Sequence, residues 1–130
     1  MPEPAPDAGP RVGPARVIAA AVARGVTVAT AESLTGGAVC AALVDVPGAS
    51  AVLRGGVVSY HRDVKVGLLG VEADRLATHG AVDPEVAAQL AAGVRTAPIA
   101  DIAVATNAVA GPEPHDGRPV GTVWVGVATA

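Results

Sequence analysis

Aromatic side chains and cysteine are scarce in this chain of 130 residues, which has no phenylalanine, one tryptophan, one tyrosine and one cysteine. The single cysteine, Cys40, excludes a disulfide within the chain and fits a reducing compartment. Without phenylalanine, the core must be filled by many small aliphatic side chains. Hydrophobic residues make up 51% and charged residues 16% of the chain, which is a globular composition of a size suited to one domain.

Concentrated positive charge and long apolar runs are also missing. Nine basic residues against twelve acidic ones give a net charge of −3, and their scatter argues against a nucleic-acid surface. No run approaches the roughly 18 to 20 apolar residues of a membrane span, and the N-terminus lacks a signal-peptide pattern. We therefore expect a cytoplasmic protein without membrane or nucleic-acid partners. We expect residues 1–14, rich in proline, to be a disordered tail before a domain over residues 15–130.

Predicted helices and strands alternate along most of the chain. We expect strands over residues 26–30, 52–60, 102–106 and 122–128, and helices over 15–24, 38–44, 63–70, 73–78 and 84–95, with Asp63 and Asp83 as helix caps. Alternation predicts a three-layer α/β/α fold with helices on both faces of the sheet. Because no helix separates the last two strands, the sheet should be mixed and mostly parallel.

The turn between the first strand and the second helix carries small polar residues, where α/β proteins usually place ligands. In one interpretation Ser33 is a nucleophile, and the amides of Gly36 and Gly37 stabilise an oxyanion or hold a phosphate. In the other, Ser33 or Thr35 only caps the helix. The local sequence favours the cap, because capping residues are far commoner than nucleophiles.

A nucleophilic serine needs a base, and histidine is a poor candidate here. His61, His79 and His115 show neither triad spacing nor metal-ligand spacing, so no metal is expected. Lys65 is the alternative, because burial can lower the pKa of a lysine until its neutral amine accepts a proton. Tyr60 could then relay or orient the proton. A solvated helix lysine and a surface aromatic fit the same residues, and these patterns alone favour that interpretation for both Lys65 and Tyr60.

Several ordered motifs resemble one family. Residues 29–37 (ATAESLTGG) are similar to the signature of the CinA C-terminal domain family, which includes nicotinamide mononucleotide amidases. The resemblance continues through residues 45–50 (DVPGAS), 55–60 (GGVVSY), Lys65, 68–71 (LLGV), 79–82 (HGAV), 110–112 (AGP) and 119–123 (PVGTV). Each motif alone is weak, but their order over residues 15–128 is specific.

The resemblance implies hydrolysis of the carboxamide of nicotinamide mononucleotide to a carboxylate, with release of ammonia and without a cofactor. It implies catalysis by Ser33 as nucleophile and Lys65 as base, with Tyr60 in the site. The substrate would contact the turn and loop residues Thr35, Gly36, Gly37, Gly111 and Pro112. Arg54 and Arg118 are the candidate phosphate partners, because a guanidinium suits bidentate contacts.

Two departures from the family pattern stand out. The family usually has Thr-Gly where this chain has Asn107-Ala108, and we expect Ala108 to weaken activity if the backbone there needs a positive φ. The chain ends at Ala130, whereas family domains usually continue through a further strand and an amphipathic helix. We therefore expect an uncovered apolar sheet face and a homo-oligomer, a dimer.

Two other functions compete with the amidase. The first is a catalytically inactive nucleotide-binding or regulatory relative, which the two departures favour and the joint presence of Ser33, Tyr60 and Lys65 opposes. The second is a dinucleotide-binding enzyme, which is weaker because no Gly-x-Gly-x-x-Gly motif follows a predicted strand.

Overall fold

The computed structural model describes residues 12–97, 100–115 and 117–130. Five helices, one 3-10 turn and four strands follow one another in this part of the chain. In chain order they are α1 (Pro14–Arg24), β1 (Val28–Glu32), α2 (Ala38–Val44), η1 (Ala49–Ala51), β2 (Leu53–Val58), α3 (Arg62–Leu69), α4 (Ala73–His79), α5 (Pro84–Thr96), β3 (Ile102–Ala108) and β4 (Val123–Thr129).

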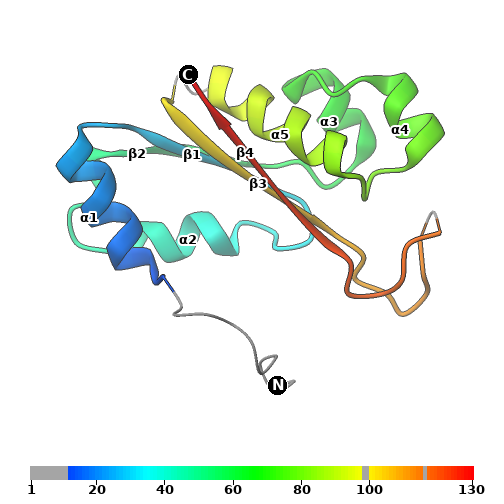
Figure 1. The fold of residues 1–130 in the computed structure, drawn as a ribbon, viewed down its shortest axis with the longest axis horizontal. Helices are drawn as coiled ribbons and strands as arrows, with labels where there is room; N and C mark the ends of the chain where they lie inside the picture. The colour runs from blue at the N-terminus through cyan, green and yellow to red at the C-terminus, as the bar shows by residue number, and fades with distance from the viewer. Residues whose placement is uncertain (1–11, 98–99, 116) are drawn as a thin grey trace.

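The four strands form one sheet in the order β2-β1-β3-β4. Strand β1 runs parallel to β2 and to β3, whereas β3 and β4 are antiparallel. Helices α1 and α2 lie on one face, and α3, α4 and α5 lie on the other (Figure 1). The predicted three-layer α/β/α fold with a mixed, mostly parallel sheet is therefore confirmed. Because β1, β2 and β3 are parallel, the residues that follow them meet at one edge of the sheet, where such folds bind ligands.

The core beneath α5 is closed by small residues that allow a very short approach between layers. Ala103 and Ala105 of β3 are fully buried, as are Val86, Leu90 and Val94 of α5. A Cβ at Gly126 of β4 would lie 2.3 Å from the carbonyl oxygen of Ala87, so only glycine fits where α5 crosses this strand. Close backbone contact thus takes the place of the large aromatic side chains that the chain lacks.

Two helix caps were predicted, and one of them is correct. Asp83 accepts hydrogen bonds from the amides of Glu85 (3.1 Å) and Val86 (3.2 Å) at the start of α5. Asp63 does not cap α3, because the helix begins one residue before it. His61 caps it instead, and its Nδ1 accepts from the amide of Asp63 at 3.1 Å.

Other boundaries differ from the predicted ones by a few residues. Strand β1 lies at residues 28–32 rather than 26–30, which places Ser33 directly after the strand. Strand β3 extends to Ala108, which pairs with Val123 in the β3–β4 ladder. The backbone of Ala108 is therefore extended, so the condition under which a positive φ would make this alanine unfavourable is not met. Residues 1–11 of the expected tail lie outside the described residues, and Pro14 already belongs to α1.

The face of β4 that points away from α5 carries exposed valines. Val123, Val125 and Val127 are each more than half exposed, whereas Gly126 between them packs against α5. The homo-oligomer stays a prediction, and light scattering of the purified chain would test it. Among the described helices, none is long and apolar enough to cross a membrane.

Candidate active site

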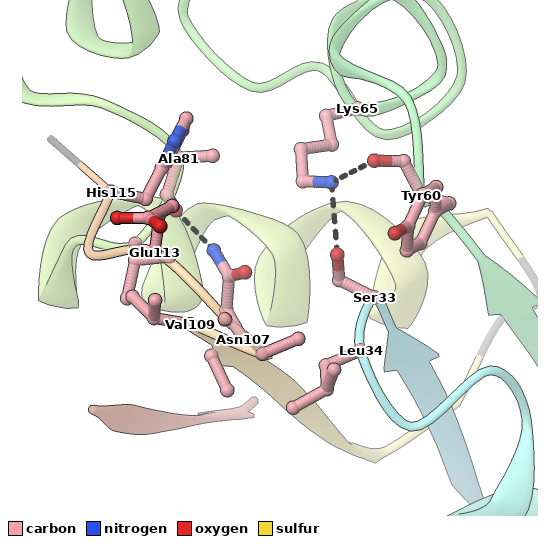
Figure 2. A pocket seen from close by; sticks show the side chains of 13 residues that line it. Ser33, Leu34, Tyr60, Lys65, Ala81, Asn107, Val109, Glu113 and His115 are labelled. Atoms are coloured by element: carbon pink, nitrogen blue, oxygen red, sulfur yellow. Dashed lines mark hydrogen bonds between the residues drawn. The ribbon is translucent and has the colours of Figure 1, made fainter. Parts of the chain in front are cut away.

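A cavity of about 370 Å³ opens at the edge of the sheet where β1, β2 and β3 end. Its walls come from the segments that follow these three strands, from α3 and from the loop before α5 (Figure 2). The lining residues are Ser33, Leu34, Tyr60, Lys65, Ala81, Val82, Asn107, Ala108, Val109, Ala110, Gly111, Glu113 and His115.

Ser33 and Lys65 meet inside this cavity. Ser33 follows the last residue of β1 and is 8% exposed, and Lys65 lies on α3 and is 1% exposed. Lys65 Nζ lies 3.3 Å from Ser33 Oγ (Figure 2). The two side chains predicted as nucleophile and base are therefore within hydrogen-bonding reach of each other, which is the geometry that a serine–lysine pair needs.

Burial of Lys65 favours its neutral amine. Burial lowers the pKa of Lys65, and no carboxylate within the described residues forms an ion pair with it. Its Nζ also donates to the carbonyl oxygens of Ser59 and of Tyr60, the latter at 2.9 Å. A neutral amine has two N–H groups and one lone pair. If the two carbonyls take both N–H groups, the lone pair is left for the hydroxyl proton of Ser33.

Glu32, the residue before Ser33, is a second buried ionisable group. Its carboxylate accepts from Thr35 Oγ1 (2.6 Å) and from the amides of Val39 (2.8 Å) and Cys40 (3.0 Å). Burial alone would raise the pKa of Glu32, but these hydrogen bonds, with one from the Gly37 amide, outweigh it and lower the pKa. Glu32 therefore stays charged and saturates the first amides of α2.

Both interpretations of the β1–α2 turn need correction. The Gly36 amide donates to the carbonyl of Ser33 at 3.2 Å, and the Gly37 amide is directed to Glu32. Neither glycine lines the cavity, so neither amide is placed to hold an oxyanion or a phosphate there. The capping interpretation is wrong as well, because Glu32 caps α2. Thr35 Oγ1 donates to Glu32 and lies 2.8 Å from Thr106 Oγ1, so it supports the turn instead of lining the cavity.

Of the remaining residues predicted to contact the substrate, one lines the cavity and three do not. Gly111 lines the cavity, whereas Pro112 and Arg118 do not. Arg118 lies in the same loop and exchanges backbone hydrogen bonds with His115. Arg54 is the second residue of β2, so it lies toward the opposite edge of the sheet from Ser33. The proposed contact of Arg54 with the phosphate therefore does not fit a site within one chain.

Tyr60 contributes differently from what we predicted. Its backbone carbonyl holds Lys65, while its side chain is 74% exposed and lines the cavity mouth (Figure 2). No hydrogen bond joins its phenol to Ser33 or Lys65 within the described residues. A proton relay through this hydroxyl therefore has no support in the geometry.

Sequence reasoning missed three contributors. Glu32 received no role, Ser59 supplies only a carbonyl, and Asn107 was considered only as a departure from the family pattern. The signal for Asn107 was available, because a polar residue ends the apolar strand β3 at the edge where ligands bind. Among the described residues, no group of His, Cys, Asp or Glu has the arrangement of a metal site.

Related solved structures share the fold closely. A competence/damage inducible protein from Agrobacterium tumefaciens is 38% identical, with a TM-score of 0.85 over 89% of this chain and 71% of that one. The competence damage-inducible protein A from Klebsiella pneumoniae is 39% identical, with a TM-score of 0.86 over 89% of this chain and 73% of that one.

Curated relatives are longer than this chain. A CinA-like protein from Frankia casuarinae is 50% identical over 112 residues, which are 86% of this chain and 26% of the relative. A putative competence-damage inducible protein from Halothermothrix orenii is 49% identical over 106 residues, 81% of this chain and 26% of the relative. The chain thus spans about a quarter of the length of these relatives. The model of the CinA C-terminal domain matches residues 13–130, and the chain belongs to that family.

Proposed function

We propose that this chain hydrolyses a carboxamide through Ser33 and Lys65, and that its substrate is nicotinamide mononucleotide. The observation that carries the proposal is the approach of Lys65 Nζ to Ser33 Oγ in a cavity where burial lowers the pKa of the lysine. A neutral lysine next to a serine hydroxyl is a nucleophile–base pair that needs neither histidine nor metal. The nucleotide substrate follows from the family resemblance, and the names of the relatives state no reaction.

The reaction would pass through an acyl-enzyme. Ser33 Oγ attacks the carboxamide carbon while its proton moves to Lys65 Nζ, which gives a tetrahedral oxyanion. Collapse of this intermediate breaks the C–N bond, and the proton on Lys65 leaves with the amine as ammonia. Water, deprotonated by Lys65, then attacks the ester on Ser33; the bond from the acyl carbon to Oγ breaks, Lys65 returns the proton to Oγ, and the acid leaves as the carboxylate.

Because Gly36 and Gly37 do not line the cavity, the oxyanion needs another donor. The amide of Leu34, the residue after the nucleophile, donates no hydrogen bond within the described residues, and Leu34 lines the cavity. In other serine hydrolases the amide after the nucleophile often takes this role. We assign the Leu34 amide as the donor to the developing oxyanion.

The phosphate of the substrate needs a cation near the cavity. A second hollow of about 340 Å³ shares Ala81 and His115 with the first and is lined by Arg62. Arg62 therefore takes the place of Arg54 as the phosphate partner in this proposal. Arg62→Gln should raise KM about tenfold with kcat little changed, whereas Arg54→Gln should leave both constants unchanged.

Ammonia release from nicotinamide mononucleotide by the purified chain tests the proposal. We expect release that requires Ser33 and yields one nicotinate mononucleotide per ammonia. Binding of the nucleotide without any release of ammonia would instead favour the inactive nucleotide-binding relative.

A further inference from the structure

Asn107 lies deep in the same cavity as Ser33 and Lys65 but has no part in the proton transfers proposed above. It is the sixth residue of β3 and pairs with Trp124 across the β3–β4 ladder. Its side chain points to the α5 side of the sheet, is 1% exposed and lines the cavity. Burial of an amide at this position requires hydrogen bonds to both of its ends.

The orientation of this amide follows from one hydrogen bond. Asn107 Nδ2 donates to the backbone carbonyl of Ala81, in the loop before α5. A rotation of the amide by half a turn would place two oxygen acceptors against each other, so the carbonyl of Ala81 selects a single orientation. The oxygen Oδ1 is then directed to the side of the cavity that holds Ser33 and Lys65 (Figure 2).

The oxygen of this amide has no donor from the protein. Within the described residues, no N–H or O–H group donates to Asn107 Oδ1. The oxygen atom is nevertheless not sealed inside the protein, because it faces the cavity. A fixed acceptor that opens only onto the catalytic cavity calls for a donor on the ligand. The substrate carboxamide carries such a donor, its NH₂ group.

We propose that Asn107 Oδ1 accepts a hydrogen bond from the scissile NH₂ group and makes the site selective for primary amides over esters and over the carboxylate product. This inference rests on the proposed function, which it deepens by naming the residue that recognises the leaving group. An ester oxygen has no hydrogen to donate, and a carboxylate places a second acceptor against Oδ1. A site built to bond an N–H discriminates strongly against ligands that lack it.

The test compares two substrates on the same enzyme. They are nicotinamide mononucleotide and the methyl ester of nicotinate mononucleotide, which share ring, ribose and phosphate and differ only in NH₂ or OCH₃. The value of kcat/KM is measured from ammonia release for the amide and from methanol release for the ester. The variants are Asn107→Leu, of similar volume without an acceptor, and Asn107→Ala. Glu72→Gln, at an exposed residue outside this cavity, is the control and should keep the wild-type ratio.

We expect both Asn107 variants to lower the amide-to-ester ratio of kcat/KM by about tenfold, as for the loss of one buried hydrogen bond. We also expect them to bind nicotinate mononucleotide more tightly relative to the amide. Because both substrates are measured on one preparation, the folded fraction cancels from the ratio. A ratio within twofold of wild type, or one shifted toward the amide, would overturn the inference. Absence of ammonia release by the wild-type chain would instead refute the proposed function itself.

Discussion

Glu32 and Lys65 are both 1% exposed, and Glu32 precedes Ser33 in the chain while Lys65 contacts it, yet their surroundings prepare them for opposite tasks. Hydrogen bonds from Thr35 and the first amides of α2 surround the Glu32 carboxylate. Lys65 meets two carbonyls and one hydroxyl and no opposite charge within the described residues. The pKa is lowered in both. A lowered pKa keeps a carboxylate charged and structural, whereas it makes an amine neutral and reactive.

The lowered pKa of each group also affects how folding stability depends on pH. A group whose pKa is lower in the folded state binds more protons in the unfolded chain, so stability rises with pH between the two values. For Glu32 this window is acidic, and its contribution is lost as the pH falls through its folded pKa. For Lys65 the window extends from its lowered pKa up to the ordinary range of lysine. Both side chains therefore make the free energy of unfolding rise with pH, Glu32 in the acidic range and Lys65 in the range below the ordinary lysine pKa.

The largest effect should follow removal of the reactive pair. Ser33→Ala and Lys65→Ala should each lower kcat for ammonia release by at least about 10³-fold, because each removes one half of the same proton transfer. The double variant should lie within about threefold of the single ones, since residues that act as a unit are not additive. Lys65→Arg should not restore activity, because a guanidinium stays protonated.

Circular dichroism provides the folding control for these four variants. Turnover by folded Ser33→Ala above one tenth of the wild-type rate would contradict the covalent mechanism. Independent, multiplying losses in the double variant would contradict the assignment of Lys65 as the base for Ser33.

Glu32, the residue with the structural role, should affect the free energy of unfolding. Glu32→Gln replaces one accepting oxygen by an NH₂ group that faces donors of α2 or Thr35, and should cost about 1–3 kcal/mol of unfolding free energy. Urea unfolding as a function of pH measures it. The variant should also lose part of the wild-type fall in stability at acid pH.

Glu72→Gln is the matched control, because Glu72 is exposed and its side chain caps nothing. It should unfold within about 0.5 kcal/mol of wild type, as is usual for surface substitutions. Equal losses in Glu32→Gln and Glu72→Gln would mean that the buried hydrogen bonds of Glu32 have no special role.

The smallest effect should come from the phenol of Tyr60. Its backbone carbonyl holds Lys65, and its exposed ring forms part of the cavity mouth. Tyr60→Phe should therefore keep kcat within about threefold of wild type, because neither the carbonyl nor the ring is lost. Tyr60→Ala should mainly raise KM, since an aromatic face suits the cationic ring of the substrate. A loss of kcat in Tyr60→Phe as large as in Lys65→Ala would support a proton relay through the Tyr60 hydroxyl.

The layers of the fold could be predicted from local patterns, whereas the pair Ser33–Lys65 was predicted from the family resemblance, because the local patterns alone favoured a cap and a solvated lysine. Ser33 follows β1 and Lys65 lies on the helix after β2, so parallel pairing brings them to one edge. The role of Glu32 was not predictable in this way, since a glutamate is rarely buried and its partners come from the next helix. The orientation of Asn107 depends on Ala81, which lies 26 residues away. Arg54 could have been rejected earlier, because it lies near the start of its predicted strand.

Lys65 is the only lysine in the chain, so its ionisation can be observed without assignment. Protein labelled with ¹³C at the lysine ε carbon should give one lysine resonance, and its shift against pH reports the pKa directly. We predict a midpoint below the ordinary lysine value of about 10.4 in the folded chain, and the ordinary value for the same chain unfolded in denaturant. A folded-state midpoint in the ordinary lysine range would contradict the neutral lysine base on which the proposed function rests.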